Sequence, residues 1–159
     1  MIYYQPRVTK GQIKQEAKPM SHRNSLQDVL QNIDPVLSSE TYVYVGLADH
    51  SLLKVLGFDP LAFYKEREGI TLILRKEEAD NNFLKYEGEY CKITLNVPFK
   101  PISTGLTAII SSALAKAGIG IKPVHTVYNS YVLINKPDAH VALEIITALQ
   151  RKIQGMNAH

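Results

Sequence analysis

Serine, threonine and glycine come together at residues 103–107, directly ahead of a strongly apolar helical pattern. The first backbone N–H groups of a helix have no partner within the helix, and the aligned peptide dipoles place partial positive charge there. Gly105 lacks the Cβ that would hold a ligand away from this backbone, while Ser103 and Thr104 could cap the helix or bind the ligand instead. The pattern therefore indicates either a carboxylate site or an ordinary helix start without a ligand.

The other reactive side chains do not form a catalytic or metal-binding pattern. Cys91 is the single cysteine, so it has no cysteine partner for a disulfide or for a metal. No two histidines, and no histidine with a carboxylate, have the spacing that is typical of zinc ligands; the five are His22, His50, His125, His140 and His159. His125 falls in a predicted strand and faces either a pocket or solvent. We therefore expect no catalytic residues, no metal and no cofactor.

Composition limits the classes of protein that the chain can belong to. Its 159 residues suffice for one ordinary domain or for two small modules that share a core. The content of 45% hydrophobic and 21% charged residues is typical of a globular protein. No apolar run approaches the roughly 20 residues that cross a bilayer, and the first segment lacks the apolar centre of a secretory signal. We expect a cytoplasmic protein without a membrane partner.

The positive charge of the chain is concentrated at its beginning. Residues 1–23 carry five basic side chains and one acidic side chain, whereas the remaining residues carry 13 basic and 14 acidic ones. The first segment is thus a basic N-terminal extension ahead of a nearly neutral folded part. Such an extension either stays solvated or contacts nucleic acid.

Hydrophobic periodicity predicts the elements that must position the candidate residues. Residues 26–33 have helical spacing, and Asp34-Pro35 ends that helix. Strand and helix patterns then follow in the order strand 40–48, short helix 51–58, strands 61–68 and 70–76, helix 76–84, strand 90–97, helix 104–117, strands 119–128 and 130–135, and a helix from Pro137.

The order strand, helix, strand, strand, helix thus occurs twice. A shift of 60 residues places TLILRKEEA (71–79) over YVLINKPDA (131–139), with matching aliphatic positions. We predict an α+β fold of two tandem ferredoxin-like βαββα modules, at 24–85 and 86–159, each an antiparallel sheet with helices on one face.

Three short motifs in this chain resemble a small bacterial group of ACT-domain proteins. In that group a Glu-Gly-(Ile/Leu)-Thr-Leu strand precedes an acidic helix, and a Gly-Leu-Thr-Ala segment opens a helix that ends in Ala-Gly-Ile. Here the motifs are Glu68–Leu72, Gly105–Ala108 and Ala117–Ile119, in the same order. The resemblance covers roughly residues 26 to 150 and implies tandem ACT-type modules.

ACT domains commonly bind amino acids or other small metabolites between modules and regulate an attached or associated protein. The resemblance implies that the strand-to-helix loop, with the strand opposite it, lines such a site. By position these residues are Ser103, Thr104, Gly105, Leu106 and Thr107, with Val124 and Thr126 opposite. Glu68 is a further candidate, as an acceptor for the ammonium group of an amino acid.

Three hypotheses about function remain open on the sequence. The first is a non-catalytic regulatory or sensor protein that binds a small molecule, namely an amino acid. The second is a structural or oligomerisation module without a ligand. The third is a nucleic-acid-associated protein that acts through residues 1–23, and it has the least support because no strand carries the aromatic pattern of an RNA-recognition motif. Exposed strand edges predict a homo-oligomer, a dimer or larger.

Overall fold

Alternating apolar residues and short turns place every described strand in a single antiparallel sheet. The computed structural model describes residues 26–48, 52–96 and 105–156. The sheet has six strands in the order β2-β3-β1-β4-β6-β5. The strands are β1 (Val36–Leu47), β2 (Ala62–Lys65), β3 (Ile70–Arg75), β4 (Glu87–Thr94), β5 (Ile121–His125) and β6 (Ser130–Asn135).

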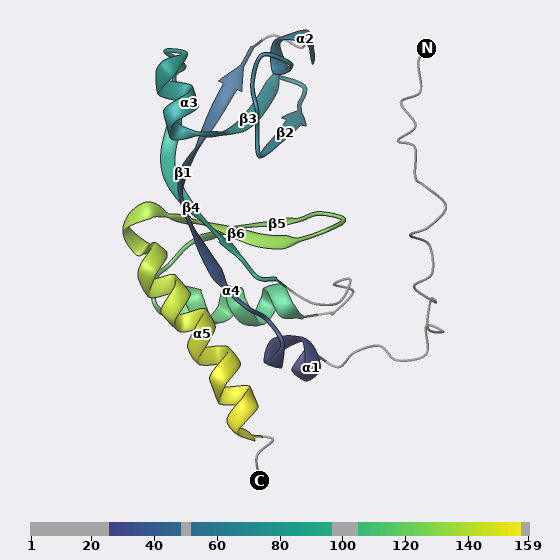
Figure 1. Cartoon of the computed structure of the whole chain (residues 1–159), viewed down its shortest axis with the longest axis vertical. Coiled ribbons are helices and arrows are strands. Elements are labelled where there is room, and N and C mark those ends of the chain that lie inside the picture. Colours follow the sequence, from purple (N-terminus) through teal and green to yellow (C-terminus); the bar gives the residue numbers. More distant parts are fainter. Residues whose placement is uncertain (1–25, 49–51, 97–104, 157–159) are drawn as a thin grey trace, which may run out of the picture.

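The helices connect these strands in the predicted order, which is thereby confirmed. They are α1 (Leu26–Gln31), α2 (Leu52–Val55), α3 (Lys76–Asn81), α4 (Leu106–Lys116) and α5 (Ala139–Met156), the last preceded by the 3₁₀ turn η1 (Lys136–Asp138). Figure 1 shows β1 as the long strand that runs from α1 at one end of the molecule to α2 at the other.

The prediction of a separate sheet in each half is wrong, because β1 pairs with β4. Tyr42 lies opposite Tyr90, and Val36 lies opposite Thr94 in this antiparallel pair. β1 and β4 are thereby each paired on both edges, which satisfies backbone groups that two separate sheets would leave open. The same pairing explains why β1 begins at Val36 rather than at residue 40.

Side-chain alternation gives the sheet two faces: the described helices cover one, and the other, called the helix-free face, carries none of the described helices. Val43, Val45 and Leu72 belong to a buried cluster with Ala79 of α3 and Val55 of α2. The residues between them in sequence point to the other face, because successive side chains of a strand alternate. The helices thus lie on one face of the sheet, as the sequence predicts.

The larger core lies under α1, α4 and α5. Its members from the helices include Leu30, Ile110, Leu114 and Ile146, and they pack on Ile93 of β4. Residues 26–33 therefore pack against the second half of the chain, although the sequence predicts that they belong to the module at 24–85. A hydrogen bond of 2.6 Å from Gln150 Nε2 to the carbonyl oxygen of Ile33 joins α5 to the end of this segment. The module boundary at residue 85 itself stays a prediction.

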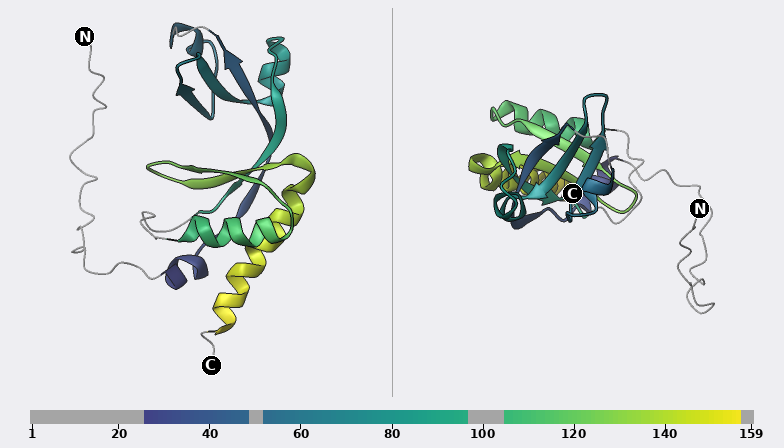
Figure 2. Two further views of the ribbon diagram at one scale, coloured as in Figure 1. Left: turned by 180° about the vertical axis from the view of Figure 1, so that it is seen from behind. Right: turned by 90° about the horizontal axis from the view of Figure 1, so that it is seen from above.

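The helix-free face is rich in tyrosine. Tyr42, Ile73 and Leu133 are buried there, and Tyr44 and Tyr90 pack against them. The two hairpins, β2–β3 and β5–β6, project to the same side of β1 and β4, as both side views show (Figures 1 and 2). On this face of the sheet, tyrosine rings rather than helices thus cover the buried side chains.

Candidate functional site

Gly105 stands at the start of α4, where the backbone geometry favours a glycine and a side chain would crowd α1. Its φ of +105° lies in the left-handed region, which glycine adopts without a steric penalty. A Cβ at this position would lie 3.1 Å from Leu26 Cδ2 of α1. The carbonyl oxygen of Gly105 accepts the N–H of Ile109 at 2.9 Å and so closes the first helical turn. These contacts explain the glycine without a ligand.

A chain of three polar side chains lies beside this helix start. Thr107 Oγ1 is 2.9 Å from His125 Nε2, and His125 Nδ1 is 3.1 Å from Ser130 Oγ. Ser130 is buried with 1% of its surface exposed, whereas the histidine is exposed. The Thr107–His125–Ser130 chain therefore runs from the buried edge of β6 to the first turn of α4.

The hairpin β5–β6 brings the two strand members of this chain together. His125 and Ser130 are paired directly across the two strands, at the end nearest the turn. Both lie on the helix-covered face, as do Ile121 and Val132, which belong to the core under α4. The first turn of α4 then adds Thr107 from a segment 18 residues earlier in sequence than His125.

This arrangement can present either a donor or an acceptor to a bound molecule. In a neutral imidazole one ring nitrogen donates and the other accepts. If Nε2 donates to Thr107 Oγ1, the hydroxyl hydrogen of the threonine is free to donate to a carboxylate. If Nε2 accepts instead, the lone pairs of Thr107 are available to an ammonium group. Among the residues that the structure describes, no side chain caps the N-terminus of α4, so these three side chains lie beside the first backbone N–H groups of the helix.

The other predicted residues near this turn have structural roles. Leu106 is a core residue with 3% of its surface exposed. Val124 pairs with Tyr131 and alternates with His125, so it lies on the helix-free face, opposite to Thr107. Thr126 caps the hairpin turn, because its Oγ1 accepts the N–H of Asn129 at 3.0 Å. Of this group, Thr107 alone makes a side-chain contact with the histidine.

Of the three remaining predicted residues, the structure describes Glu68 alone, and Glu68 lies away from this arrangement. Ser103 and Thr104 lie outside the described residues. Glu68 lies in the turn between β2 and β3, and in the strand order this hairpin is at the opposite edge of the sheet from β5. There Glu68 lines a small hollow of about 280 Å³ together with Gly69 and Leu47. The described residues of the predicted ligand site therefore lie at two separate places: around the start of α4 and the β5–β6 hairpin, and in the turn between β2 and β3.

The histidine and its serine partner were not predicted to act together. The sequence presents His125 as a candidate without a partner and Ser130 as the first residue of the predicted strand 130–135. The signal that could have found them is the hairpin itself, because residues equally distant from a short turn lie opposite each other. What the sequence could not supply is the approach of α4 to that hairpin.

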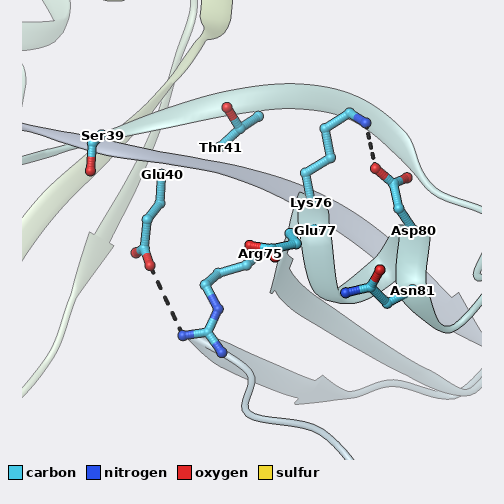
Figure 3. A pocket seen from close by; sticks show the side chains of 8 residues that line it. All are labelled: Ser39, Glu40, Thr41, Arg75, Lys76, Glu77, Asp80 and Asn81. Atoms are coloured by element: carbon cyan, nitrogen blue, oxygen red, sulfur yellow. Dashed lines mark hydrogen bonds and ion pairs between the residues drawn. The ribbon is translucent and has the colours of Figure 1, made fainter.

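A second, more polar hollow lies where β1 passes the start of α3. It has a volume of about 480 Å³ and is lined by Ser39, Glu40, Thr41, Arg75, Lys76, Glu77, Asp80 and Asn81. In Figure 3 the ammonium of Lys76 points to the carboxylate of Asp80, at 2.7 Å, and the guanidinium of Arg75 points to Glu40. Glu40, Arg75, Lys76 and Asp80 of this hollow therefore have ionic partners within the protein.

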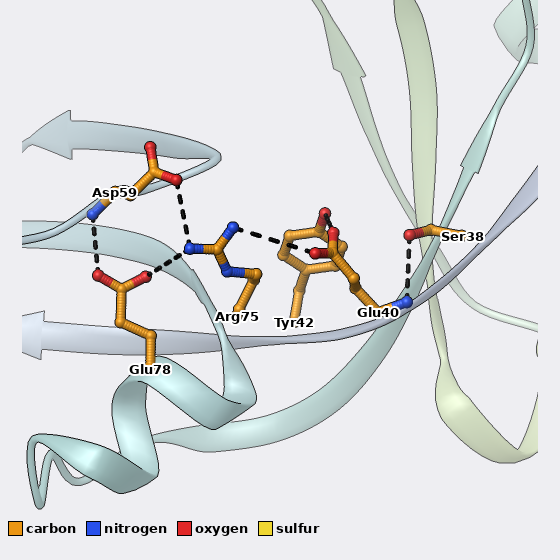
Figure 4. A network of polar contacts seen from close by, with 6 residues as sticks. All are labelled: Ser38, Glu40, Tyr42, Asp59, Arg75 and Glu78. Carbon is orange, nitrogen blue, oxygen red and sulfur yellow. Dashed lines mark hydrogen bonds and ion pairs between the residues drawn. The ribbon is translucent and has the colours of Figure 1, made fainter.

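Arg75 connects three segments through its guanidinium group (Figure 4). Its Nη2 lies 3.2 Å from Asp59 and 3.7 Å from Glu78, and its Nη1 lies 4.0 Å from Glu40. Glu40 also accepts a 2.6 Å hydrogen bond from the Tyr42 hydroxyl. Burial, followed by this neighbouring carboxylate, raises the pKa of Tyr42 to about 12. Partly exposed ion pairs of this kind contribute about 0–1 kcal/mol each, so the network positions side chains more than it stabilises the fold.

The described residues contain neither a cluster of metal ligands nor a helix that could span a membrane. Within residues 26–48, 52–96 and 105–156, no group of three or more histidine, cysteine, aspartate or glutamate side chains could hold a metal ion. In the same part of the chain, no helix combines the length and the hydrophobicity that a membrane crossing needs.

Comparison with known proteins places this geometry in a family. The profile of the ACT domain matches residues 23–91. The crystal structure of a Vibrio cholerae protein of unknown function, described as a possible transport protein, is 30% identical, with a TM-score of 0.72 over 79% of this chain and 96% of that one. A search of curated proteins finds no match.

Two more distant structures share the fold alone. Clostridium acetobutylicum aspartate kinase is 13% identical, with a TM-score of 0.58 over 74% of this chain and 34% of that one. The regulatory subunit of aspartate kinase from Thermus flavus is also 13% identical, with a TM-score of 0.55 over 72% of this chain and 95% of that one. The family profile, the fold and the relative that is 30% identical over most of its length lead to one conclusion: this chain belongs to the ACT domain family.

Proposed function

We propose that the protein is a non-catalytic regulator that binds an amino acid at the start of α4. The observation that carries the proposal is the Thr107–His125–Ser130 chain beside a helix N-terminus that no described side chain caps. A carboxylate would lie against the first N–H groups of α4, where the helix dipole contributes about 0.3–1 kcal/mol at an exposed position. Thr107 would donate to it or accept from the ammonium group. A ligand that carries both charges matches a site that offers both donors and acceptors.

Membership of the ACT domain family supports a regulatory, ligand-binding role in general. The strand order also supports two tandem modules, because β1 and β4 pair at the centre, β3 and β6 flank them, and β2 and β5 form the two edges. In this proposal the first module spans 24–85 and the second 86–159, after the basic extension at 1–23. The protein acts in the cytoplasm on an associated partner.

Binding of amino acids to the full chain tests the site. In isothermal titration calorimetry with the twenty standard L-amino acids, we expect at least one to bind in the millimolar range or tighter. Thr107→Val removes the hydroxyl at nearly constant volume, so the affinity for that amino acid should fall about tenfold, the effect of losing a hydrogen bond to a charged group. His125→Phe should have a similar effect.

Thr147→Val is the matched control for this experiment. The hydroxyl of Thr147 donates to the carbonyl oxygen of Leu143 at 2.8 Å within α5, away from the start of α4. The control should therefore bind as the unmodified chain does. Absence of binding by every amino acid at about 10 mM, or equal losses in Thr107→Val and Thr147→Val, would contradict the proposal.

We also propose that two copies associate through the β2 edge of the sheet. β2 exposes Phe63 and Tyr64, with 48% and 43% of their surfaces accessible. The β5 edge is less suited to pairing, because Pro123 lacks an N–H group and Lys122 adds charge. The two copies would extend the antiparallel sheet across the shared edge.

Light scattering coupled to size-exclusion chromatography measures this association. Phe63→Lys places a charge on the apolar edge, and we expect the mass of a dimer to fall to that of a monomer. Val141→Lys, on α5 with 50% of the side chain exposed, is the control and should leave the mass unchanged. A monomeric unmodified chain, or a dimer that persists in Phe63→Lys, would overturn this assignment of the interface.

A further inference from the structure

We propose that the helix-free face carries a second binding site, for a small aromatic carboxylate, beside Lys122. This site is separate from the proposed amino-acid site, which lies on the helix-covered side of the same hairpin. The inference rests on an open pocket, on a lysine without an ionic partner among the described residues, and on a glycine in a β-bulge that makes room for one wall.

The pocket is formed by strands from both halves of the chain. Its volume is about 570 Å³, and its lining residues are Tyr44, Gly46, Thr71, Lys85, Tyr86, Glu87, Tyr90 and Lys122. Pockets for small molecules commonly measure about 300–1,000 Å³. β1, β3, β4 and β5 all contribute, so the site exists only because β1 and β4 join the two halves in one sheet.

Lys122 supplies the positive charge of this pocket. From the edge strand β5 its ammonium reaches over the rings of Tyr44 and Tyr90, at 4.9 Å and 5.3 Å from their centroids. Among the residues that the structure describes, no carboxylate lies within 4.0 Å of this ammonium, and no oxygen accepts a hydrogen bond from it. The lysine is thus held by aromatic faces and retains its donors for an anion.

The tyrosine wall is built by a bulge in β4. The pairing of β1 with β4 shifts register between Tyr42 and Tyr44. Gly88 lies in this irregularity with a φ of +67°, and a Cβ there would lie 2.6 Å from the Tyr90 hydroxyl oxygen. The absence of that Cβ lets the Tyr90 ring lie across the glycine. The ring then meets Tyr44 edge to face, with centroids 5.3 Å apart and planes at 79°.

The character of the lining selects the class of ligand. Lys85 and Lys122 carry two positive charges and Glu87 carries one negative charge, which leaves one positive charge to match a monoanion. Burial, followed by the neighbouring tyrosines, raises the pKa of Tyr44 to about 12, so its hydroxyl keeps its proton and can donate. Three tyrosine rings in the lining favour a planar apolar body on the ligand. A single carboxylate on an aromatic ring meets these requirements.

Benzoate is the probe for this site, and neutral benzamide is its uncharged counterpart. Calorimetry or saturation-transfer NMR on the full chain should detect benzoate in the millimolar range, with benzamide about tenfold weaker. Lys122→Met keeps the apolar stem and removes the charge, so benzoate affinity should fall about tenfold. Glu87→Gln removes a repelling charge and should strengthen benzoate binding about threefold.

Lys92→Met is the matched control, because Lys92 makes the same kind of contact outside the pocket. Its ammonium lies 5.4 Å from the Tyr42 ring and 5.8 Å from the Tyr131 ring. This control and Thr107→Val should both bind benzoate within about twofold of the unmodified chain. The proposal is overturned if benzoate does not bind, if benzamide binds equally well, or if the two lysine variants lose affinity equally. If Lys122→Met does not fold, Glu87→Gln provides the test, because its affinity for benzoate should rise. An unchanged or weaker affinity for benzoate in Glu87→Gln would overturn the proposed site.

Discussion

Gly69→Ala is expected to destabilise the protein by about 4 kcal/mol, because the new methyl group collides with the backbone of β1. A Cβ at Gly69 would lie 2.1 Å from the carbonyl oxygen of Leu47 and 3.1 Å from its carbonyl carbon. Neither atom belongs to a flexible side chain, so the two strands must separate where Leu47 pairs with Ile70. The φ of +155° adds backbone strain for any other residue.

Urea unfolding followed by circular dichroism measures this loss. Gly46→Ala is the matched control, since it is the same substitution in β1 and its new Cβ would meet no atom within 4 Å. The free energy of unfolding of the control should stay within about 0.5 kcal/mol of the unmodified chain. A difference of less than about 1 kcal/mol between the two variants would show that the strands tolerate the methyl group.

Leu114→Ala should cost about 3 kcal/mol of unfolding free energy, because it opens a cavity in the core under α4. Leu114 is fully buried among Ile110, Ile119 and Ile146. Its neighbours come from two helices and from the segment before β5, so they cannot close the space by moving together. Replacing such a residue with alanine removes buried apolar atoms, and the atoms that surrounded them lose their van der Waals contacts.

Leu56→Ala is the control for the cavity, because the same atoms are removed from a side chain that is 80% exposed. We expect that variant to unfold within about 0.5 kcal/mol of the unmodified chain. The chain has nine tyrosines and no tryptophan, so tyrosine fluorescence provides a second probe of the transition. Equal effects of the two leucine substitutions would refute the assignment of Leu114 to the core.

The glycines of the ACT-like motifs have structural explanations in this fold. Gly69 is the glycine of the Glu68–Leu72 motif, and it allows β3 to approach the end of β1. Gly105 opens α4 with a left-handed φ of +105°, and Gly118 follows that helix with a φ of +73°. In the site proposed at the start of α4, the second motif therefore contributes Thr107 rather than its glycine.

Local sequence determined the elements of this protein and their order. Hydrophobic spacing predicted α4 within residues 104–117, where the structure has Leu106–Lys116, and it predicted the hairpin that follows. Proline and glycine predicted helix ends, because their backbone preferences act within a few residues. These features depend on neighbours in sequence, and a sequence shows such neighbours directly.

The tertiary structure alone decided which of those elements meet. The pairing of β1 with β4 converts two predicted sheets into one, and the contact of α4 with the β5–β6 hairpin joins Thr107 to His125. The same pairing brings Tyr44 and Tyr90 from different halves under Lys122. Such contacts depend on the burial of whole faces and on the satisfaction of strand edges, which are properties of the assembled sheet. The sequence therefore determined the parts, and packing determined both candidate sites.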